Sequence, residues 1–117
     1  MLIKLNLSGH QNAALAEMGF DFPGNLHVDL SDPKLAEKLT AFLTPLMGSG
    51  DTVHLAAPGL APLAVLTITI IHGLTGHFPV LVPLVRGKEG FVPAEPIRLE
   101  DIRNDVARVT REDTIVL

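Results

Sequence analysis

Hydrophobic and polar positions follow two periods along this chain. Short apolar or alternating runs predict four strands: Leu2 to Leu7, Asn25 to Leu30, Thr52 to Ala57 and Pro79 to Arg86. The third run is apolar enough to lie in the middle of a sheet. A turn at residues 87–90 and a short returning strand at Phe91-Val92 follow the fourth.

Helical spacing predicts three helices, two between these strands and one after the last strand. Gln11 to Met18 is a short one with Gly19 at its C-cap. Ser31-Asp32-Pro33 starts the next, which runs to about Leu46, with Pro45 marking its end. The last spans Leu99 to Arg108 and carries acidic residues in its first turn, where they suit the helix dipole.

The segment from Leu60 to Leu74 is ambiguous by pattern. Its Thr-Ile-Thr-Ile-Ile run has strand propensity, whereas its length favours a helix. Topology decides for a buried helix, because a parallel strand that follows needs a crossover and only this segment supplies one. The chain, residues 1–117, is therefore predicted to be a single three-layer α/β domain around a mostly parallel sheet of four to five strands.

Composition excludes several classes of function. Aromatic residues make up 4% of the chain, with no Trp or Tyr, which argues against an aromatic RNA-binding sheet. The net charge of -4 argues against duplex DNA or RNA as partner. There is no Cys, and the longest apolar run is too short to span a membrane. No signal peptide is expected at the N-terminus, so we predict a cytoplasmic protein without membrane attachment.

Ligands of parallel α/β sheets bind beyond the carboxyl ends of the strands. After the first strand this edge receives Asn6, Ser8, Gly9 and His10. Ser8 is equally well explained as a phosphate contact or as a helix cap, a role that Asn12 could also fill. His10 has the near-neutral pKa range of a proton donor, although a lone histidine is more often just solvated.

Two further turns reach the same predicted edge. At Pro58-Gly59-Leu60, glycine would allow close approach of a ligand to backbone N–H groups, or would simply serve a tight turn. Arg86 and Lys88 are the cations at a strand end, where they would neutralise phosphates or keep a hairpin tip in solution. Together the three turns predict a modest anion site.

Metal and cofactor signatures are missing from the sequence. His72 and His77 are five residues apart but fall at the opposite edge of the predicted sheet, with no carboxylate or Cys nearby in sequence to complete a zinc site. There is no P-loop, Gly-x-Gly-x-x-Gly, Gly-x-Ser-x-Gly or His-Glu-x-x-His motif. We expect no metal and no cofactor.

Longer motifs carry a resemblance to a known family. These are H-L-A-A-P-G-L-A-P-L-A from His54, I-I-H-G-L-T-G-H-F-P-V-L from Ile70, L-N-L-S-G-H from Leu5 and I-R-L-E-D-I-R-N-D-V-A-R from Ile97. In them the chain resembles the fifteenth of the Csx families, small accessory proteins of type III CRISPR antiviral systems that are related in fold to CARF domains and ring nucleases.

The resemblance implies a Rossmann-like, CARF-like homodimer that binds cyclic oligoadenylate through Asn6, Ser8, His10 and Pro58-Gly59-Leu60, with Arg86 matching less closely. Cyclic tetra-adenylate is the ring we expect first. A protein that sequesters this messenger, alone or in a ligand-linked assembly, is the expected function. The alternative is a metal-independent ring nuclease using Ser8 and His10, although no base is paired with an orienting carboxylate. A third reading is a structural subunit that docks a partner around Leu74 to Phe78.

Overall fold

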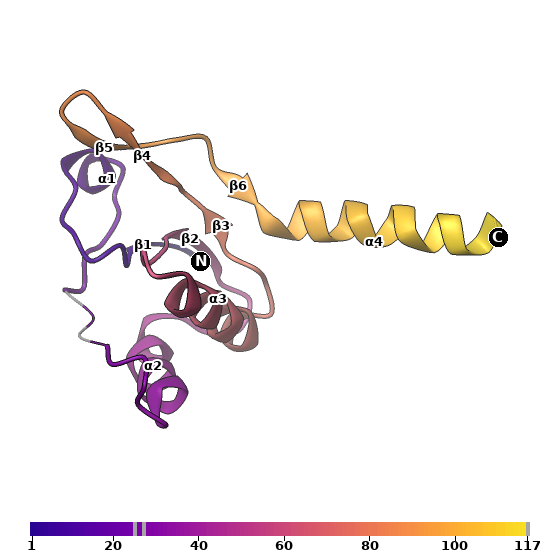
Figure 1. Ribbon diagram of the computed structural model, residues 1–117, viewed down its shortest axis with the longest axis horizontal. Helices are drawn as coiled ribbons and strands as arrows, with labels where there is room; N and C mark the ends of the chain where they lie inside the picture. Colours follow the sequence, from indigo (N-terminus) through magenta and orange to yellow (C-terminus); the bar gives the residue numbers. More distant parts are fainter. Residues whose placement is uncertain (25, 27, 117) are drawn as a thin grey trace.

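A mixed, mostly parallel sheet of four strands organises the fold. The computed structural model describes residues 1–24, 26 and 28–116, with side chains as far as Thr110. The strands are β1 (Leu2–Asn6), β2 (Thr52–Ala56), β3 (Val80–Leu81) and β6 (Ile97–Arg98), in the order β1-β2-β3-β6. The first three are parallel and β6 is antiparallel to β3, so the predicted α/β class is confirmed (Figure 1).

The register of the sheet sorts its side chains into two faces. One row runs Leu5, Leu55, Leu81, Ile97 across the four strands. The neighbouring row runs Lys4, His54, Val80, Arg98 and faces the other side, because successive side chains of a strand point to opposite faces. Leu5, Leu55 and Leu81 of the apolar row form the floor of the main core, whereas Ile97 at the sheet edge is exposed.

Two helices cover the face of the apolar row. They are α2 (Leu35–Leu43), continued by a short 3-10 turn at Thr44–Leu46, and α3 (Ala61–Thr75). Leu39 and Leu43 of α2, with Leu63 and Ile71 of α3, pack on Leu5, Val53 and Leu55 in one aliphatic core. Pro45 lies in the 3-10 turn and ends α2, as predicted, because a proline cannot continue the hydrogen-bond ladder of an α-helix.

The ambiguous segment is helical, as topology required. Pro62 lies in the first turn of α3, where its missing N–H costs nothing. Gly76 ends the helix with φ 86°, and its N–H donates to the His72 carbonyl. The buried hydroxyl of Thr67 donates to the carbonyl of Leu63, four residues earlier, so its strand propensity yields to an internal hydrogen bond.

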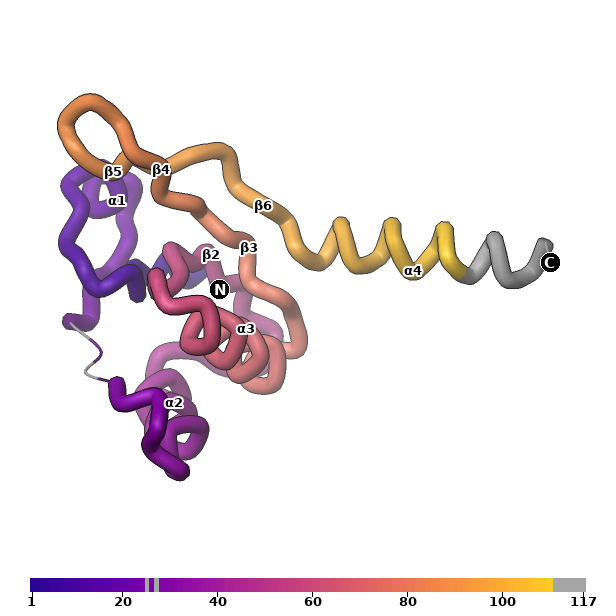
Figure 2. The backbone as a smooth tube through the Cα atoms, in the orientation of Figure 1, coloured from indigo at the N-terminus to yellow at the C-terminus, as the bar shows by residue number. Residues whose placement is uncertain are grey.

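The opposite face of the sheet is covered by shorter elements. Helix α1 (Ala13–Glu17) buries Leu15 against Phe20, Ala56 and Val82. Beside it lies a separate hairpin of β4 (Leu84–Gly87) and β5 (Gly90–Pro93), seen in Figure 2 as a loop folded over α1. Helices thus flank both faces of the sheet.

The predicted fourth strand, Pro79 to Arg86, is wrong as one strand. It divides at Val82-Pro83 into β3, which joins the main sheet, and β4, which pairs only with β5. Pro83 has no N–H to offer a ladder, and a proline inside such a run ends pairing in the sheet. The returning strand at Phe91-Val92 is confirmed as part of β5.

The strand predicted from Asn25 to Leu30 is also wrong for its described residues. Leu26, Val28 and Asp29 adopt no regular structure and Leu30 is in a turn, while residues 25 and 27 lie outside the described part. Asp21 occupies the sheet edge instead: its N–H donates to the Lys4 carbonyl and its carbonyl accepts from the Asn6 N–H. The chain then leaves the sheet and packs Leu26 and Val28 on the core.

Helix α4 (Leu99–Val116) extends away from the rest of the molecule (Figure 1). It is longer than the predicted Leu99 to Arg108 and contacts the body at β3, near its first turn. In the described part of the chain, no helix combines the length and the apolar character that crossing a membrane requires.

Candidate ligand pocket

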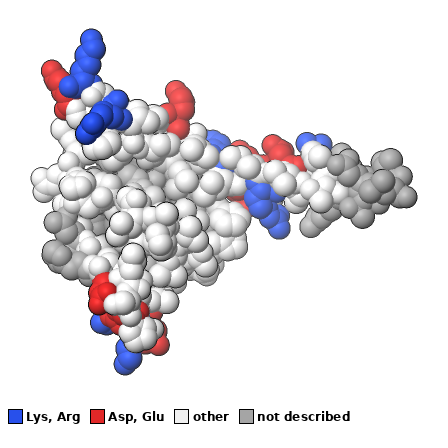
Figure 3. All heavy atoms as spheres, viewed as in Figure 1, with Lys and Arg blue, Asp and Glu red and all other residues white. Residues whose placement is uncertain are grey.

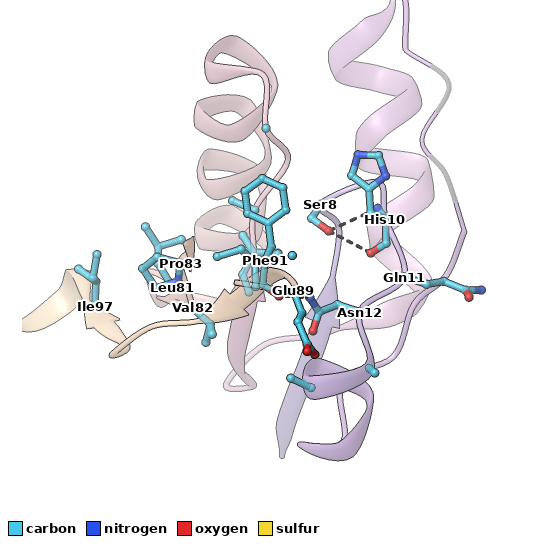
Figure 4. Close-up of a pocket in the computed structure, with 17 residues that line it drawn as sticks. Ser8, His10, Gln11, Asn12, Leu81, Val82, Pro83, Glu89, Phe91 and Ile97 are labelled. Atoms are coloured by element: carbon cyan, nitrogen blue, oxygen red, sulfur yellow. Dashed lines mark hydrogen bonds between the residues drawn. The ribbon is translucent and has the colours of Figure 1, made fainter. Parts of the chain in front are cut away.

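A cavity of about 840 Å³ lies at the carboxyl edge of the parallel strands (Figure 4). Its size is within the usual range for small-molecule sites. The apolar floor comes from the sheet and from the segment after β3, and the remaining walls come from the loop after β1, the turn before α3 and the β4–β5 hairpin. The cavity therefore lies at the sheet edge where the strand order predicts ligand binding, and binding there stays a prediction.

The turn after β1 is held by the side chain of Asn6. This side chain is 2% exposed, and its Nδ2 donates to the His10 carbonyl at 2.8 Å. Its Oδ1 accepts from the Ser8 N–H at 3.1 Å and from the Ser8 Oγ at 2.6 Å. Asn6 does not line the pocket, so its observed role is to shape the turn that presents Ser8 and His10.

Ser8 and His10 both line the pocket, and Gly9 between them has φ 89°. The Ser8 hydroxyl also lies 3.2 Å from the His10 carbonyl and 3.4 Å from the His10 N–H. Ser8 does not cap α1; Asn12 does, its Oδ1 accepting from the Leu15 N–H at 3.0 Å. Among the described residues, the imidazole of His10 has no hydrogen-bond partner.

The turn after β2 reaches the pocket through Gly59. Pro58 is buried and Leu60 is exposed at the N-cap of α3, and neither lines the cavity. No side chain of the described residues caps the start of α3. The first N–H groups of this helix are thus without a side-chain acceptor beside Gly59, where a helix favours negative charge.

The β4–β5 hairpin places the predicted cations beside the pocket and not inside it. Arg86 is in β4 with its guanidinium carbon 6.0 Å from the centre of the Phe91 ring, and Lys88 is exposed in the turn. Neither lines the cavity, whereas Glu89 and Phe91 do. Figure 3 shows blue and red side chains at the hairpin tip and a largely uncharged surface across the body below it.

This arrangement alters the electrostatics expected of the site. Among the described lining residues there is one carboxylate, that of Glu89, and neither Lys nor Arg. Polar contacts inside are offered by Ser8, His10, Gln11 and Asn12, and the remaining wall is mostly aliphatic. The interior suits an uncharged, partly apolar group, and the cations suit an anion at the mouth.

The two conspicuous histidines lie at the far end of α3, as predicted. The ring of His72 is 4.3 Å from that of Phe78, and His77 Nδ1 is 3.8 Å from a carboxylate oxygen of Glu100. That carboxylate was not foreseen, but no group of three or more potential metal ligands forms within the described chain. Leu74 and Phe78 are each partly buried, which leaves little apolar surface for the docking role considered for this segment.

Several pocket residues escaped the sequence reasoning. Glu89, Phe91 and Pro83 reach the pocket because the hairpin folds over α1, and Gln11 and Asn12 line it from the loop before that helix. A hydrogen bond holds the hairpin over α1: Asn12 Nδ2 donates to the Phe91 carbonyl at 2.9 Å. Pro83 was the available signal, since a proline within an apolar run indicates that the run changes sheets or ends.

Comparisons with known proteins give no functional assignment, so the pocket itself has to be interpreted. No model of a protein family matches the chain, and neither the curated proteins nor the solved structures that were searched gave a match.

Proposed function

We propose that this protein binds cyclic oligoadenylate, cyclic tetra-adenylate before other rings, as a cytoplasmic homodimer that sequesters the messenger of type III CRISPR defence. The observation that carries the proposal is the cavity at the carboxyl edge of the sheet, into which the turns of Ser8, His10 and Gly59 converge. These are positions at which the sequence resembles the fifteenth Csx family. A two-fold ligand also suits a two-fold dimer, each subunit taking half of the ring.

The distribution of charge suggests how such a ligand would lie. An adenine base fits the interior, which has neither Lys nor Arg and one carboxylate, that of Glu89, and where Phe91 offers an aromatic face. Phosphates would lie at the mouth, within reach of the N–H groups at the start of α3 and of Arg86 and Lys88 on the hairpin. This division accounts for binding a polyanion to a protein of net charge -4.

The same geometry favours binding over cleavage. The Ser8 hydroxyl is 2.6 Å from Asn6 Oδ1, so its proton is already engaged. Among described residues no carboxylate orients His10 for proton transfer, in contrast to the paired groups of most acid–base sites. A ring nuclease is the second candidate, because His10 lines the pocket and its imidazole is not engaged elsewhere in the described structure.

A binding-and-turnover assay tests the proposal. Purified protein is incubated with labelled cyclic tri-, tetra- and hexa-adenylate, and the bound and recovered species are analysed. Stoichiometric retention and intact recovery support sequestration. We expect Arg86→Ala and Lys88→Ala to weaken binding roughly tenfold each at low salt, because each variant removes a cation that would neutralise a phosphate. Lys34→Ala, at the start of α2 and outside the pocket lining, is the matched control.

Two other outcomes of the binding-and-turnover assay would change the proposal. Time-dependent formation of linear products that His10→Ala abolishes would replace sequestration by a nuclease. If no ring binds to the intact protein, both candidates fail.

A further inference from the structure

Glu89 is the one carboxylate among the described residues that line the pocket. It lies in the turn between β4 and β5, next to Lys88 and three residues after Arg86. Although both cations are close in sequence, neither forms an ion pair with Glu89 in the described chain. Figure 4 shows its side chain extended instead toward Asn12, the N-cap of α1. The carboxylate thus belongs to the wall of the pocket, and the cations belong to its rim.

The carboxylate of Glu89 accepts hydrogen bonds and donates none. The neighbouring donors of the pocket are already used, because Asn12 Nδ2 donates to the Phe91 carbonyl at 2.9 Å and the Ser8 hydroxyl lies 2.6 Å from Asn6 Oδ1. In the described part of the chain no side chain donates to Glu89. A ligand that fills the pocket takes solvent away from this acceptor, and leaving it without a donor costs binding free energy. The pocket therefore favours a ligand with an N–H group on the side of Glu89.

The aromatic ring beside this acceptor is that of Phe91, two residues further along the hairpin. The ring is 54% exposed although it lines the pocket, so it offers surface to a flat ligand. Arg86, its direct partner across the hairpin, has its guanidinium carbon 6.0 Å from the ring centre. A nucleotide whose base stacks on Phe91 therefore meets a cation for its phosphate and a carboxylate for its base on the same hairpin.

Adenine has one hydrogen-bond donor on its base edge that suits such an acceptor, the exocyclic amine. We propose that Glu89 selects adenine by accepting a hydrogen bond from this amine while the base stacks on Phe91. The inference rests on the proposed binding of cyclic oligoadenylate and adds the residue that recognises the base. It also accounts for a carboxylate in the wall of a site for a polyanion: the carboxylate faces the base, and the phosphates stay with the cations at the rim.

Two ligands that differ only by the amine test this role. Adenosine 5′-monophosphate carries the amine, purine riboside 5′-monophosphate has hydrogen in its place, and the same pair of bases is compared in four-membered cyclic rings. Isothermal titration calorimetry with the full chain gives the dissociation constants. We expect the wild type to bind the adenine member of each pair roughly tenfold more tightly, because a site built to accept from a donor rejects the analogue that lacks it.

Variants of Glu89 should change this ratio of dissociation constants. Glu89→Ala should reduce it to about one, and Glu89→Gln should keep roughly threefold, since an amide oxygen still accepts from the amine but without the charge. Removing the carboxylate also raises the affinity for the phosphates of both ligands, so the ratio is the readout and neither constant alone. Glu95→Ala removes the same charge outside the pocket lining and should leave the ratio at roughly tenfold. Circular dichroism establishes that each variant is folded.

The outcomes separate this inference from the proposed function. A wild-type ratio near one overturns the role of Glu89, and so does a ratio that Glu89→Ala leaves unchanged. Tighter binding of guanosine 5′-monophosphate than of adenosine 5′-monophosphate also overturns it, because a carboxylate can accept from two N–H groups of guanine. Cyclic tetra-adenylate that binds without regard to the amine leaves the proposed function standing alone. Amine-dependent binding of the monophosphate by a chain that binds no cyclic oligoadenylate keeps the role of Glu89 and rejects the proposed function. If no nucleotide binds, both fail.

Discussion

The side-chain amide of Asn12 joins the start of α1 to the backbone of Phe91, 79 residues later in the chain, through an N–H···O bond of 2.9 Å. The Oδ1 of the same side chain accepts from the Leu15 N–H and caps the helix. One residue therefore fixes both the helix and the hairpin that wall the pocket. Because the helix cap and the bond to the hairpin use different atoms of the Asn12 side chain, substitutions can remove them separately.

We predict that Asn12→Asp keeps the helix cap and loses the hydrogen bond to the hairpin. Aspartate caps helices about as well as asparagine, but its carboxylate has no donor for the Phe91 carbonyl and is repelled by it. Amide hydrogen exchange in the hairpin, read at Val85 and Val92, should become faster while the global unfolding free energy changes little.

Asn12→Ala should remove both the cap and the hydrogen bond to Phe91. We expect the same faster exchange together with a decrease of about 1 kcal/mol in unfolding free energy, the usual cost of removing an N-cap. Equal unfolding free energies for the Asp and Ala variants would show that the cap contributes nothing measurable.

A second prediction concerns Asn6, whose three side-chain hydrogen bonds shape the turn of Ser8 and His10. Asn6→Ala should lower the unfolding free energy by about 2 kcal/mol, because buried polar groups of the turn lose their partners. Ser8→Ala removes one of these bonds and should cost about 1 kcal/mol. Urea unfolding measures both, with the exposed Gln11→Ala as control.

Measuring ligand binding together with stability distinguishes a residue that shapes the turn from a residue that contacts the ligand. If Asn6 acts by shaping the turn, Asn6→Ala weakens binding and stability together, whereas His10→Ala weakens binding alone. A variant of Asn6 that binds normally despite its reduced stability would show that the turn geometry does not matter to the ligand.

Local signals in the sequence were sufficient for β1 and β2, because the alternation of β1 and the apolar run of β2 are each encoded within a few residues. The helical state of α3 was predicted from topology instead, because its local pattern is ambiguous. The wrong strand prediction arose because residues from another part of the chain compete for the same edge of the sheet. Asp21 takes the sheet edge that Asn25 to Leu30 was expected to occupy, and no pattern near residue 25 reports on that choice.

The residues of the candidate site likewise divide into those that the sequence could place and those that it could not. Ser8, His10 and Gly59 could be placed because loops that follow parallel strands meet at one edge. Glu89 and Phe91 could not, because their position depends on the hairpin leaving the sheet at Pro83 and on a bond from Asn12. The same departure carried Arg86 and Lys88 away from the interior of the site, which changes the expected contact from a cationic pocket to a cationic rim.

A third prediction uses two glycines of α3 that differ in backbone conformation. Gly73 is exposed within the helix, and a Cβ placed there meets no atom within 4 Å. Gly73→Ala should raise the unfolding free energy by about 0.5–1 kcal/mol by restricting the unfolded chain. Gly76 has equal space but a φ of 86°, so Gly76→Ala should lower it by about 1 kcal/mol. Urea unfolding of the two variants measures both, and changes of the same sign would contradict this account of the α3 terminus.

The last prediction concerns acid stability. Asp51 Oδ2 accepts from the Gly48 N–H at 2.9 Å, and this bond is the main cause that holds the pKa of Asp51 below 3.8. A carboxyl whose pKa is lowered by folding contributes stability above its unfolded pKa and loses it as the pH falls through the folded value. Asp51→Asn should therefore lower the thermal midpoint at pH 7, and the difference from wild type should shrink as the pH falls below 3.8.

Glu95→Gln, exposed in the loop between β5 and β6, is the control and should show little difference at either pH. A gap between Asp51→Asn and wild type that is as wide in acid as at pH 7 would mean that the stability contributed by Asp51 does not depend on its charge, whether through the Gly48 N–H or through the N-terminal ammonium 3.3 Å from Oδ1.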